Sequence, residues 1–197
     1  MRAAYDGATA LIVVDVQNDF ADPKGSLSVH GGERVPEAVN REIAAAREAG
    51  AFLVYSQDWH PEHTPHFEVD GGVWPVHCVG GTWGAEFHSD LDVTDDAVVL
   101  RKGTGGEDGY SVFTVRDPET GEEAATALER ILREHGIERV VIGGLATDYC
   151  VKDTVLDARR LGFPVTVLSH AIAAVDLHEG DGARAEQLMR DAGAEFD

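Results

Sequence analysis

Apolar residues along the chain form two kinds of segment, short continuous runs and longer stretches in which they recur every three or four positions. The short runs are rich in β-branched residues, which is typical of parallel strands covered on both faces. The longer stretches are typical of amphipathic helices. The pattern predicts strands at 10–14, 52–58, 97–103, 139–145 and 164–172, with 194–196 as a short sixth strand. It predicts helices at 36–49, 122–135, 148–161 and 182–191.

Because strands and helices alternate, the pattern predicts an α/β fold with right-handed crossovers. We expect a three-layer, doubly wound sheet, mainly parallel, of about six strands with helices on both faces. Ligand sites in such folds lie beyond the carboxyl ends of the strands. Residues 59–89 break the alternation, with weak periodicity, many glycines and prolines, all three tryptophans and most of the histidines. Loops of this length in compact domains are usually functional.

Composition narrows the class of protein. A chain of 197 residues can bury one substantial core, and no shift in composition marks a boundary, so we expect a single domain over residues 1–197. A net charge of −20 argues against nucleic acid and anionic membranes as partners. No apolar run is long enough to span a membrane, and residues 1–17 lack the apolar core of a signal peptide. Two cysteines without a disulfide spacing fit a reducing compartment, so we expect a cytoplasmic protein, and a homo-oligomer is compatible with the sequence.

Four ionisable residues fall at or just beyond the ends of predicted strands: Asp15, Asp58, Lys102 and Cys150. Cys150 would lie in the first turn of a helix, where unpaired N–H groups and the helix dipole favour an anion and lower the pKa of a thiol. A lone cysteine is more commonly a small buried apolar residue. Its coincidence with the other three groups favours a catalytic thiol.

In that hypothesis Asp15 takes the thiol proton of Cys150 and later protonates a leaving amine. Lys102 supplies the positive charge that keeps both groups ionised and oriented. The alternative for Asp15 is a structural role, capping the following turn through its side chain. The alternative for Lys102 is a solvated surface position.

The loop after the second predicted strand brings together Asp58, His60, His63, His66 and His77. A carboxylate and imidazoles at short spacings suit a divalent transition metal that keeps positions open for water or a ligand. Zinc, iron and manganese all accept such donors. His63 would substitute for another histidine only if the register of the loop differs.

Three aromatic residues could wall a flat apolar slot for an aromatic ring: Phe20, Trp74 and Tyr110. Core packing is the alternative for each, and the commoner one for Phe20. Competing catalytic motifs are missing from the sequence, which contains no GxSxG elbow, no GxxxxGK[ST] loop, no HExxH and no CxxC pair.

Six motifs occur in one order along the chain: VVDVQNDF, SQDWHPEH, WPVHCVGGTWGAEFH, LRKG, YSVF and GLATDYCV. In these motifs the sequence resembles the isochorismatase-like cysteine hydrolases, and among them the nicotinamidases. The resemblance implies hydrolysis of nicotinamide to nicotinate and ammonia through a cysteine thioester, a step of NAD salvage, with pyrazinamide as a further substrate. The chain departs from the family pattern at its short C-terminus, which leaves little room for a full last strand.

The resemblance also implies roles for residues that match the family's motifs. The catalytic triad falls on Asp15, Lys102 and Cys150, and the oxyanion hole on the backbone amides of Ala146 and Cys150, with a non-proline cis peptide just before Ala146. One divalent transition metal, zinc as the first expectation and iron or manganese as alternatives, is implied with its ligands at Asp58, His60 and His77. His66 matches a position that is a further ligand in some relatives. The pyridine nitrogen of the substrate is implied to face the metal, with Phe20, Trp74 and Tyr110 bordering the ring.

Two alternatives stay open. The first is another amide or ureido hydrolase that uses the same triad on a different acyl group. The second is a metal-binding or redox-sensing protein without catalysis, in which Cys150 and Cys78 oxidise or bind metal. The second alternative leaves Asp15 and Lys102 unexplained.

Overall fold

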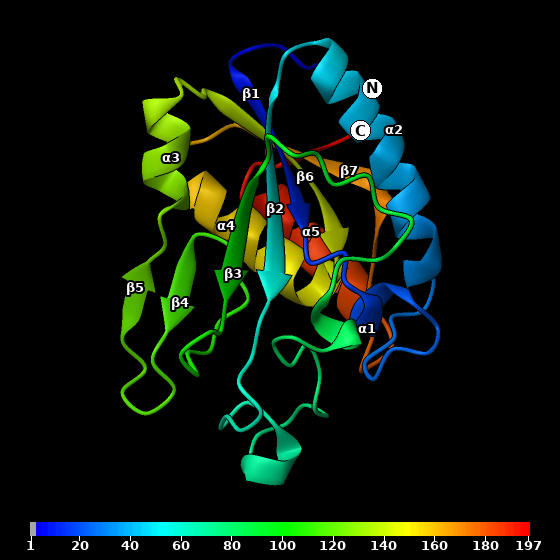
Figure 1. Ribbon diagram of the computed structural model, residues 1–197. Helices are drawn as coiled ribbons and strands as arrows, with labels where there is room; N and C mark the ends of the chain where they lie inside the picture. Colours follow the sequence, from blue (N-terminus) through cyan, green and yellow to red (C-terminus); the bar gives the residue numbers. More distant parts are fainter. Residues whose placement is uncertain (1–2) are drawn as a thin grey trace.

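A six-stranded parallel sheet forms the centre of the computed structural model, which describes residues 3–197 (Figure 1). The strand order is β3-β2-β1-β6-β7-β8, and every adjacent pair is parallel. The strands are β1 (Thr9–Val14), β2 (Phe52–Asp58), β3 (Val98–Lys102), β6 (Arg139–Leu145), β7 (Val165–Ala173) and β8 (Glu195–Phe196). The α-helices are α1 (Asn18–Ala21), α2 (Val35–Glu48), α3 (Leu128–Glu134), α4 (Lys152–Arg160) and α5 (Asp181–Asp191). The predicted fold class is confirmed.

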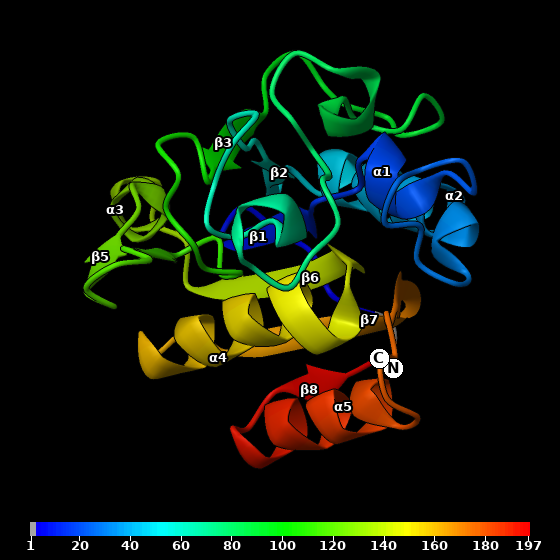
Figure 2. The same cartoon turned by 90° about the horizontal axis from the view of Figure 1, so that it is seen from below.

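Helices cover both faces of the sheet, as Figure 2 shows with α2 on one side and α4 and α5 on the other. Alternate residues of β1 enter different cores, because successive side chains of a strand point to opposite faces. Leu11 and Val13 pack in the core with α2, whereas Ile12 and Val14 pack in the core with α3, α4 and α5. A strand buried on both faces needs a continuous apolar run, and β1 has one.

The middle of the sheet is the point where the chain reverses its direction of winding. β1, β2 and β3 build outward to one edge, and β6, β7 and β8 build outward to the other. The backbones of β6 and β1 come very close, since a Cβ on Gly144 would lie 2.1 Å from the carbonyl oxygen of Val14. Gly144 also has a positive φ of 126°. Only glycine fits there, and the close approach brings the residues after β1 and β6 together at the topological switch point.

One predicted helix is wrong in its first half. Residues 122–135 were expected to be helical, but Glu123–Ala125 form β5, which pairs antiparallel with β4 (Thr114–Arg116). The three β5 residues are all exposed, so they offer no apolar face that would hold a helix against the core. Helix α3 begins only at Leu128. Just before it, the hydroxyl of Thr126 donates a hydrogen bond to the carbonyl of Val112.

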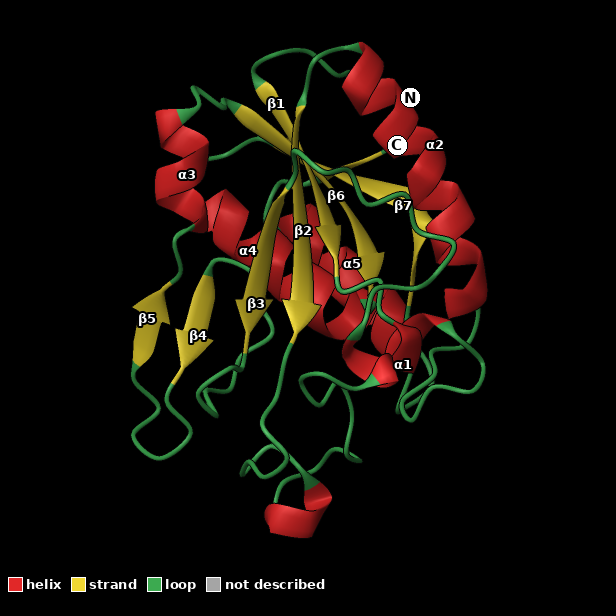
Figure 3. Ribbon diagram, viewed as in Figure 1, coloured by secondary structure: helices red, strands yellow, loops and turns green. Residues whose placement is uncertain are grey.

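The other predicted elements agree closely with the structure. The strands β2 and β6 have the predicted bounds, and the last strand is present as the two-residue β8 beside β7. The helix expected from residue 148 begins as a π-helical turn, Thr147–Val151, and continues as α4. Residues 59–89 form an extended loop with two short 3-10 turns, Glu68–Asp70 and Trp83–Ala85 (Figure 3). None of the helices within residues 3–197 has the length and apolar character needed to cross a membrane.

Candidate active site

Asp15 lies directly after β1 and is completely buried. Ser56 on the neighbouring strand donates its hydroxyl to Asp15 Oδ1 at 2.7 Å, and Oγ of Ser56 accepts the backbone N–H of Asp15 at 3.2 Å. Lys102 Nζ lies 2.8 Å from Asp15 Oδ2. Burial raises the pKa of the Asp15 carboxyl even though the Lys102 ammonium opposes the shift. A carboxyl with a raised pKa holds a proton more readily than an ordinary aspartate, which suits a group that accepts and returns one.

Lys102, the last residue of β3, joins three buried groups. Its Nζ pairs with Asp15, donates a hydrogen bond to Asp58, and lies 3.5 Å from Cys150 Sγ. Burial alone would lower the pKa of this amine, but the two carboxylates raise it well above its usual range. Lys102 is therefore a fixed positive charge in a site with two carboxylates and a thiol.

Cys150 lies in the π-helical turn after β6, as expected for the start of a helix, and is buried. One carboxylate oxygen of Asp15, one of Asp58 and Sγ of Cys150 lie within 4.8 Å of one another. Burial raises the pKa of the thiol well above its usual range, and Asp15 adds to the shift while Lys102 opposes it. The expectation of a lowered thiol pKa is wrong, because burial and two nearby carboxylates outweigh the helix terminus and one shared ammonium. Cys150 is therefore a thiol at rest, and it would need a base to act as a nucleophile.

Ala146 lies between β6 and this turn, and the peptide bond that precedes it is cis, as the resemblance implied. Its carbonyl accepts the N–H groups of Tyr149 and Val151, which closes the turn around Cys150. The backbone amides of Ala146 and Cys150 thus belong to one tight turn, the location expected for an oxyanion hole.

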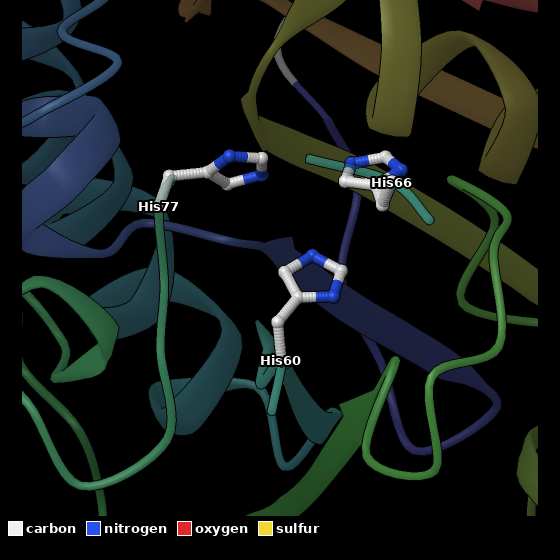
Figure 4. Close-up of side chains that lie close together, drawn as sticks. All are labelled: His60, His66 and His77. Carbon is white, nitrogen blue, oxygen red and sulfur yellow. The ribbon is translucent and has the colours of Figure 1, made fainter. Parts of the chain in front are cut away.

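Three imidazoles converge beside this group (Figure 4). His60, His66 and His77 each offer one ring nitrogen within 4.8 Å of the others. The carbonyl of Pro75 accepts Nδ1–H of His77 at 2.7 Å. Both ring nitrogens of His60 are buried and have no hydrogen-bond partner among the described residues. Convergent imidazole nitrogens without hydrogen-bond partners are typical ligands of a divalent transition metal.

The protonation states of the histidines fit the same chemistry. Burial lowers the pKa of His60 to about 4, against the nearby charge of Asp58, and also lowers the pKa of His77. Both rings are neutral at pH 7. Neutral imidazole is the form that binds metal.

Asp58 lies between the group formed by Asp15, Lys102 and Cys150 and the cluster of three histidines. One of its oxygens accepts the hydrogen bond from Lys102, and the other lies 3.9 Å from Nε2 of His60. Burial alone would raise the pKa of Asp58, but Lys102 together with His60 and His77 lowers it to about 2. Asp58 is thus an ionised carboxylate at the edge of the histidine cluster rather than at its centre.

A cavity lies between Cys150 and two of the histidines, His66 and His77. Phe20, Trp74 and Tyr110 line it as predicted, together with three residues that the sequence did not single out. These are Leu27, Tyr149 and Val175. The ring of Tyr149 stands edge-on to Trp74 and to Tyr110, with centroids 4.8 and 5.2 Å apart. Its position next to Cys150 in the sequence was the only available signal.

Phe20 is both a core residue and a residue of the cavity wall. It is buried in the core on the α2 side of the sheet, and it lines the cavity with its ring centroid 5.5 Å from that of His77. Two other sequence candidates stay outside the site. His63 is exposed and pairs with Asp70, and Cys78 is fully buried away from the cavity lining.

We expect Tyr110→Phe to destabilise the wall of the cavity. The indole N–H of Trp74, a nearly buried side chain, donates to the Tyr110 hydroxyl at 3.0 Å. Loss of this acceptor leaves a donor unpaired, which costs about 1–3 kcal/mol in the free energy of unfolding. Urea denaturation measures the loss, and Tyr149→Phe is the matched control because it removes a neighbouring hydroxyl that is not bonded to Trp74. Equal stability of the two variants would contradict the role given to this hydrogen bond.

The arrangement combines a thiol that lines an aromatic cavity, a buried carboxyl within 4.8 Å of that thiol, and a fixed cation that contacts both. These are the parts needed for attack on a carbonyl group, followed by protonation of its leaving group. The opposite wall carries the imidazoles of His66 and His77, which belong to the histidine cluster.

Known proteins resemble this chain over most of its length. The model of the isochorismatase domain matches residues 9–195. A nicotinamidase of Escherichia coli is 37% identical over 201 residues, which cover 94% of this chain and 92% of the relative. The crystal structure of a pyrazinamidase of Pyrococcus horikoshii in complex with zinc is 41% identical, with a TM-score of 0.86 and coverage of 96% of this chain and 98% of that one. The structure of PnC1 from L. infantum in complex with nicotinate is 35% identical, with a TM-score of 0.89 and coverage of 100% and 96%.

Proposed function

The chain belongs to the isochorismatase family, and on this premise we propose that it hydrolyses nicotinamide to nicotinate and ammonia in NAD salvage. The observation that carries the proposal is the meeting of the thiol of Cys150 and the three-histidine cluster at one aromatic cavity. A planar aromatic amide has a reactive carbon at one end and a ring nitrogen at the other. The cavity offers a nucleophile to the first and a metal site to the second.

The named relatives support this substrate class. The E. coli relative is a nicotinamidase and the L. infantum structure contains nicotinate. The P. horikoshii relative is a pyrazinamidase, so we include pyrazinamide among the substrates. Tyr149, Trp74 and Tyr110 would hold the flat ring through edge and face contacts.

In the first half of the reaction, Asp15 accepts the thiol proton of Cys150. The Cys150 sulfur then attacks the carboxamide carbon, and the backbone amides of Ala146 and Cys150 donate hydrogen bonds to the oxyanion that develops. Asp15 returns its proton to the amine as the C–N bond breaks. Ammonia leaves, and the nicotinoyl group stays on Cys150 as a thioester.

In the second half, Asp15 accepts a proton from water while the water oxygen attacks the thioester carbon. Collapse of this intermediate breaks the C–S bond, and Asp15 returns the proton to the sulfur. The raised pKa of Asp15 suits a group that carries the proton in both halves. Lys102 holds Asp15 in place throughout and balances the charge that passes between the carboxylate and the sulfur.

We propose zinc as the resident metal, with iron and manganese as alternatives that the same donors accept. The unpaired nitrogens of His60 and the convergence of three imidazoles fit such an ion, and the zinc complex of the P. horikoshii relative supports the choice. Asp58, His60 and His77 would hold it, with His66 as the further ligand that the cluster of three imidazoles offers. When bound, the metal supplies a Lewis acid that fixes the ring nitrogen of the substrate.

We expect metal removal to lower kcat/KM for nicotinamide by a factor of roughly 10–100, the equivalent of one charge-assisted contact of about 1.5–3 kcal/mol. Chelator-treated protein, with and without added Zn²⁺, provides the measurement. Benzamide is the control substrate, because it lacks the ring nitrogen and should be affected little. Equal losses for both amides would show that the metal acts on the fold or the nucleophile instead of on the ring.

Ammonia release by metal-replete protein tests the proposed function. We expect fast release from nicotinamide and slow release from benzamide. The alternative is another amide or ureido hydrolase that uses the same Cys150 nucleophile, and a panel of ureido acids and aliphatic amides would identify it. Turnover of one of those compounds without turnover of nicotinamide would replace the proposal.

A further inference from the structure

His66 differs from the other two histidines of the cluster in its second hydrogen bond. Its Nδ1 lies 2.9 Å from Oδ1 of Asp108, a residue 42 positions later in the chain. The side chain of His66 is 7% exposed and that of Asp108 is 21% exposed. A carboxylate accepts hydrogen bonds, so His66 donates Nδ1–H and keeps the lone pair on Nε2. His77 donates to a backbone carbonyl instead, and His60 has no such partner in the described chain.

Asp108 is itself held by several contacts. Its second oxygen accepts from Nη2 of Arg116 at 2.7 Å, and Oδ1 also accepts the backbone N–H of Gly109 at 2.8 Å. The backbones of Asp108 and Arg116 exchange two hydrogen bonds of 2.7 Å. Arg116 is the last residue of β4, and β4 pairs with β5 to form a hairpin. The carboxylate that meets His66 is thus anchored to the β4–β5 hairpin.

We propose that Asp108 is a positioning residue for the metal, selecting the tautomer of His66 and aiming its Nε2 into the histidine cluster. The inference rests on the metal site of the proposed function. A carboxylate behind a metal-binding imidazole fixes the orientation of the ring and increases the basicity of its free nitrogen. Loss of such a partner typically weakens metal binding by about 10–100-fold. The hairpin then has a function, which is to hold the carboxylate through Arg116.

The contact could serve folding alone, with His66 as one more partner of an ion pair between Asp108 and Arg116. The two roles differ in what they predict for a variant that keeps its fold. Asp108→Asn keeps the size of the side chain but removes its charge, and its amide can donate to Nδ1 and favour the wrong tautomer. Glu107→Gln is the matched control, because it removes one negative charge at the neighbouring position. Within the described chain, the Glu107 carboxylate accepts a hydrogen bond only from the backbone N–H of Gly105.

The experiment measures Zn²⁺ affinity by competition with a chromophoric chelator, and the tautomer of His66 by ¹⁵N NMR on metal-free protein. We expect Asp108→Asn to bind Zn²⁺ roughly 10–100-fold more weakly and to lose the Nδ1–H form of His66, while Glu107→Gln matches the wild type. Arg116→Gln leaves His66 untouched and should give a smaller loss of affinity in the same direction. It also serves as the test if Asp108→Asn does not fold.

Unchanged Zn²⁺ affinity and tautomer in folded Asp108→Asn would overturn the inference, and so would an equal loss of affinity in Glu107→Gln. Neither readout uses turnover, so the proposed function can fail separately. A wild-type protein that binds Zn²⁺ through His66 but releases no ammonia from nicotinamide would remove the proposed function and leave the role of Asp108 intact.

Discussion

Replacement of Cys150 by alanine is expected to lower kcat for nicotinamide by a factor of roughly 10⁴ or more, since no other group can form the thioester. The fold and the metal content should survive. Cys150 is the smallest side chain of the catalytic group, and the three histidines that would hold the metal lie on a different part of the chain. Steady-state ammonia release, circular dichroism and metal analysis provide the three measurements.

Cys78→Ala is the matched control for this variant. Both cysteines are free and buried, but Cys78 does not line the cavity. We expect Cys78→Ala to keep its turnover within a few-fold, with a modest loss of stability from lost packing. Retained turnover in Cys150→Ala would remove the nucleophile from the account, and a comparable loss in Cys78→Ala would point to general damage.

Lys102→Met is expected to destabilise the folded protein by about 3–5 kcal/mol, because it leaves two buried carboxylates without their shared cation. Asp15 and Asp58 both pair with Lys102 Nζ, and both are buried. Turnover should also fall sharply, since Asp15 loses the contact that holds it near Cys150. Denaturant unfolding at pH 7 measures the first effect and ammonia release the second.

Two further variants test whether the lost positive charge causes the loss of stability in Lys102→Met. Lys24→Met removes an exposed lysine and should change the unfolding free energy by less than about 0.5 kcal/mol. Adding Asp15→Asn to Lys102→Met removes one of the stranded charges, so the double variant should recover part of the stability but no activity. A double variant less stable than Lys102→Met would contradict the assigned electrostatics.

The meeting of the three candidate catalytic residues could be predicted from the sequence, because parallel strands bring their carboxyl ends to one edge of the sheet. Asp15, Lys102 and Cys150 each follow or end a strand with a clear apolar pattern, and the structure brings them together. The histidines are close in sequence, within one loop, so their convergence was also predictable. The aromatic residues could be named only with core packing as an open alternative, since an aromatic side chain has the same pattern in a core as in a cavity wall.

Features that depend on contacts between distant segments could not be predicted. The raised pKa of the Cys150 thiol comes from burial and from two carboxylates on other strands. The β4–β5 hairpin is short and exposed, so it has no periodicity to mark it. The contact between Asp108 and His66 spans 42 residues and carries no motif.

The most direct test of the central claim is whether hydrolysis passes through a nicotinoyl thioester on Cys150. Hydroxylamine competes with water for such an intermediate and yields the hydroxamate. Nicotinamide and methyl nicotinate have different leaving groups but would form the same thioester, so the account predicts one ratio of hydroxamate to nicotinate from both substrates at each hydroxylamine concentration. Ratios that differ between the substrates, or rapid loss of nicotinamide without any hydroxamate, would contradict the acyl-enzyme.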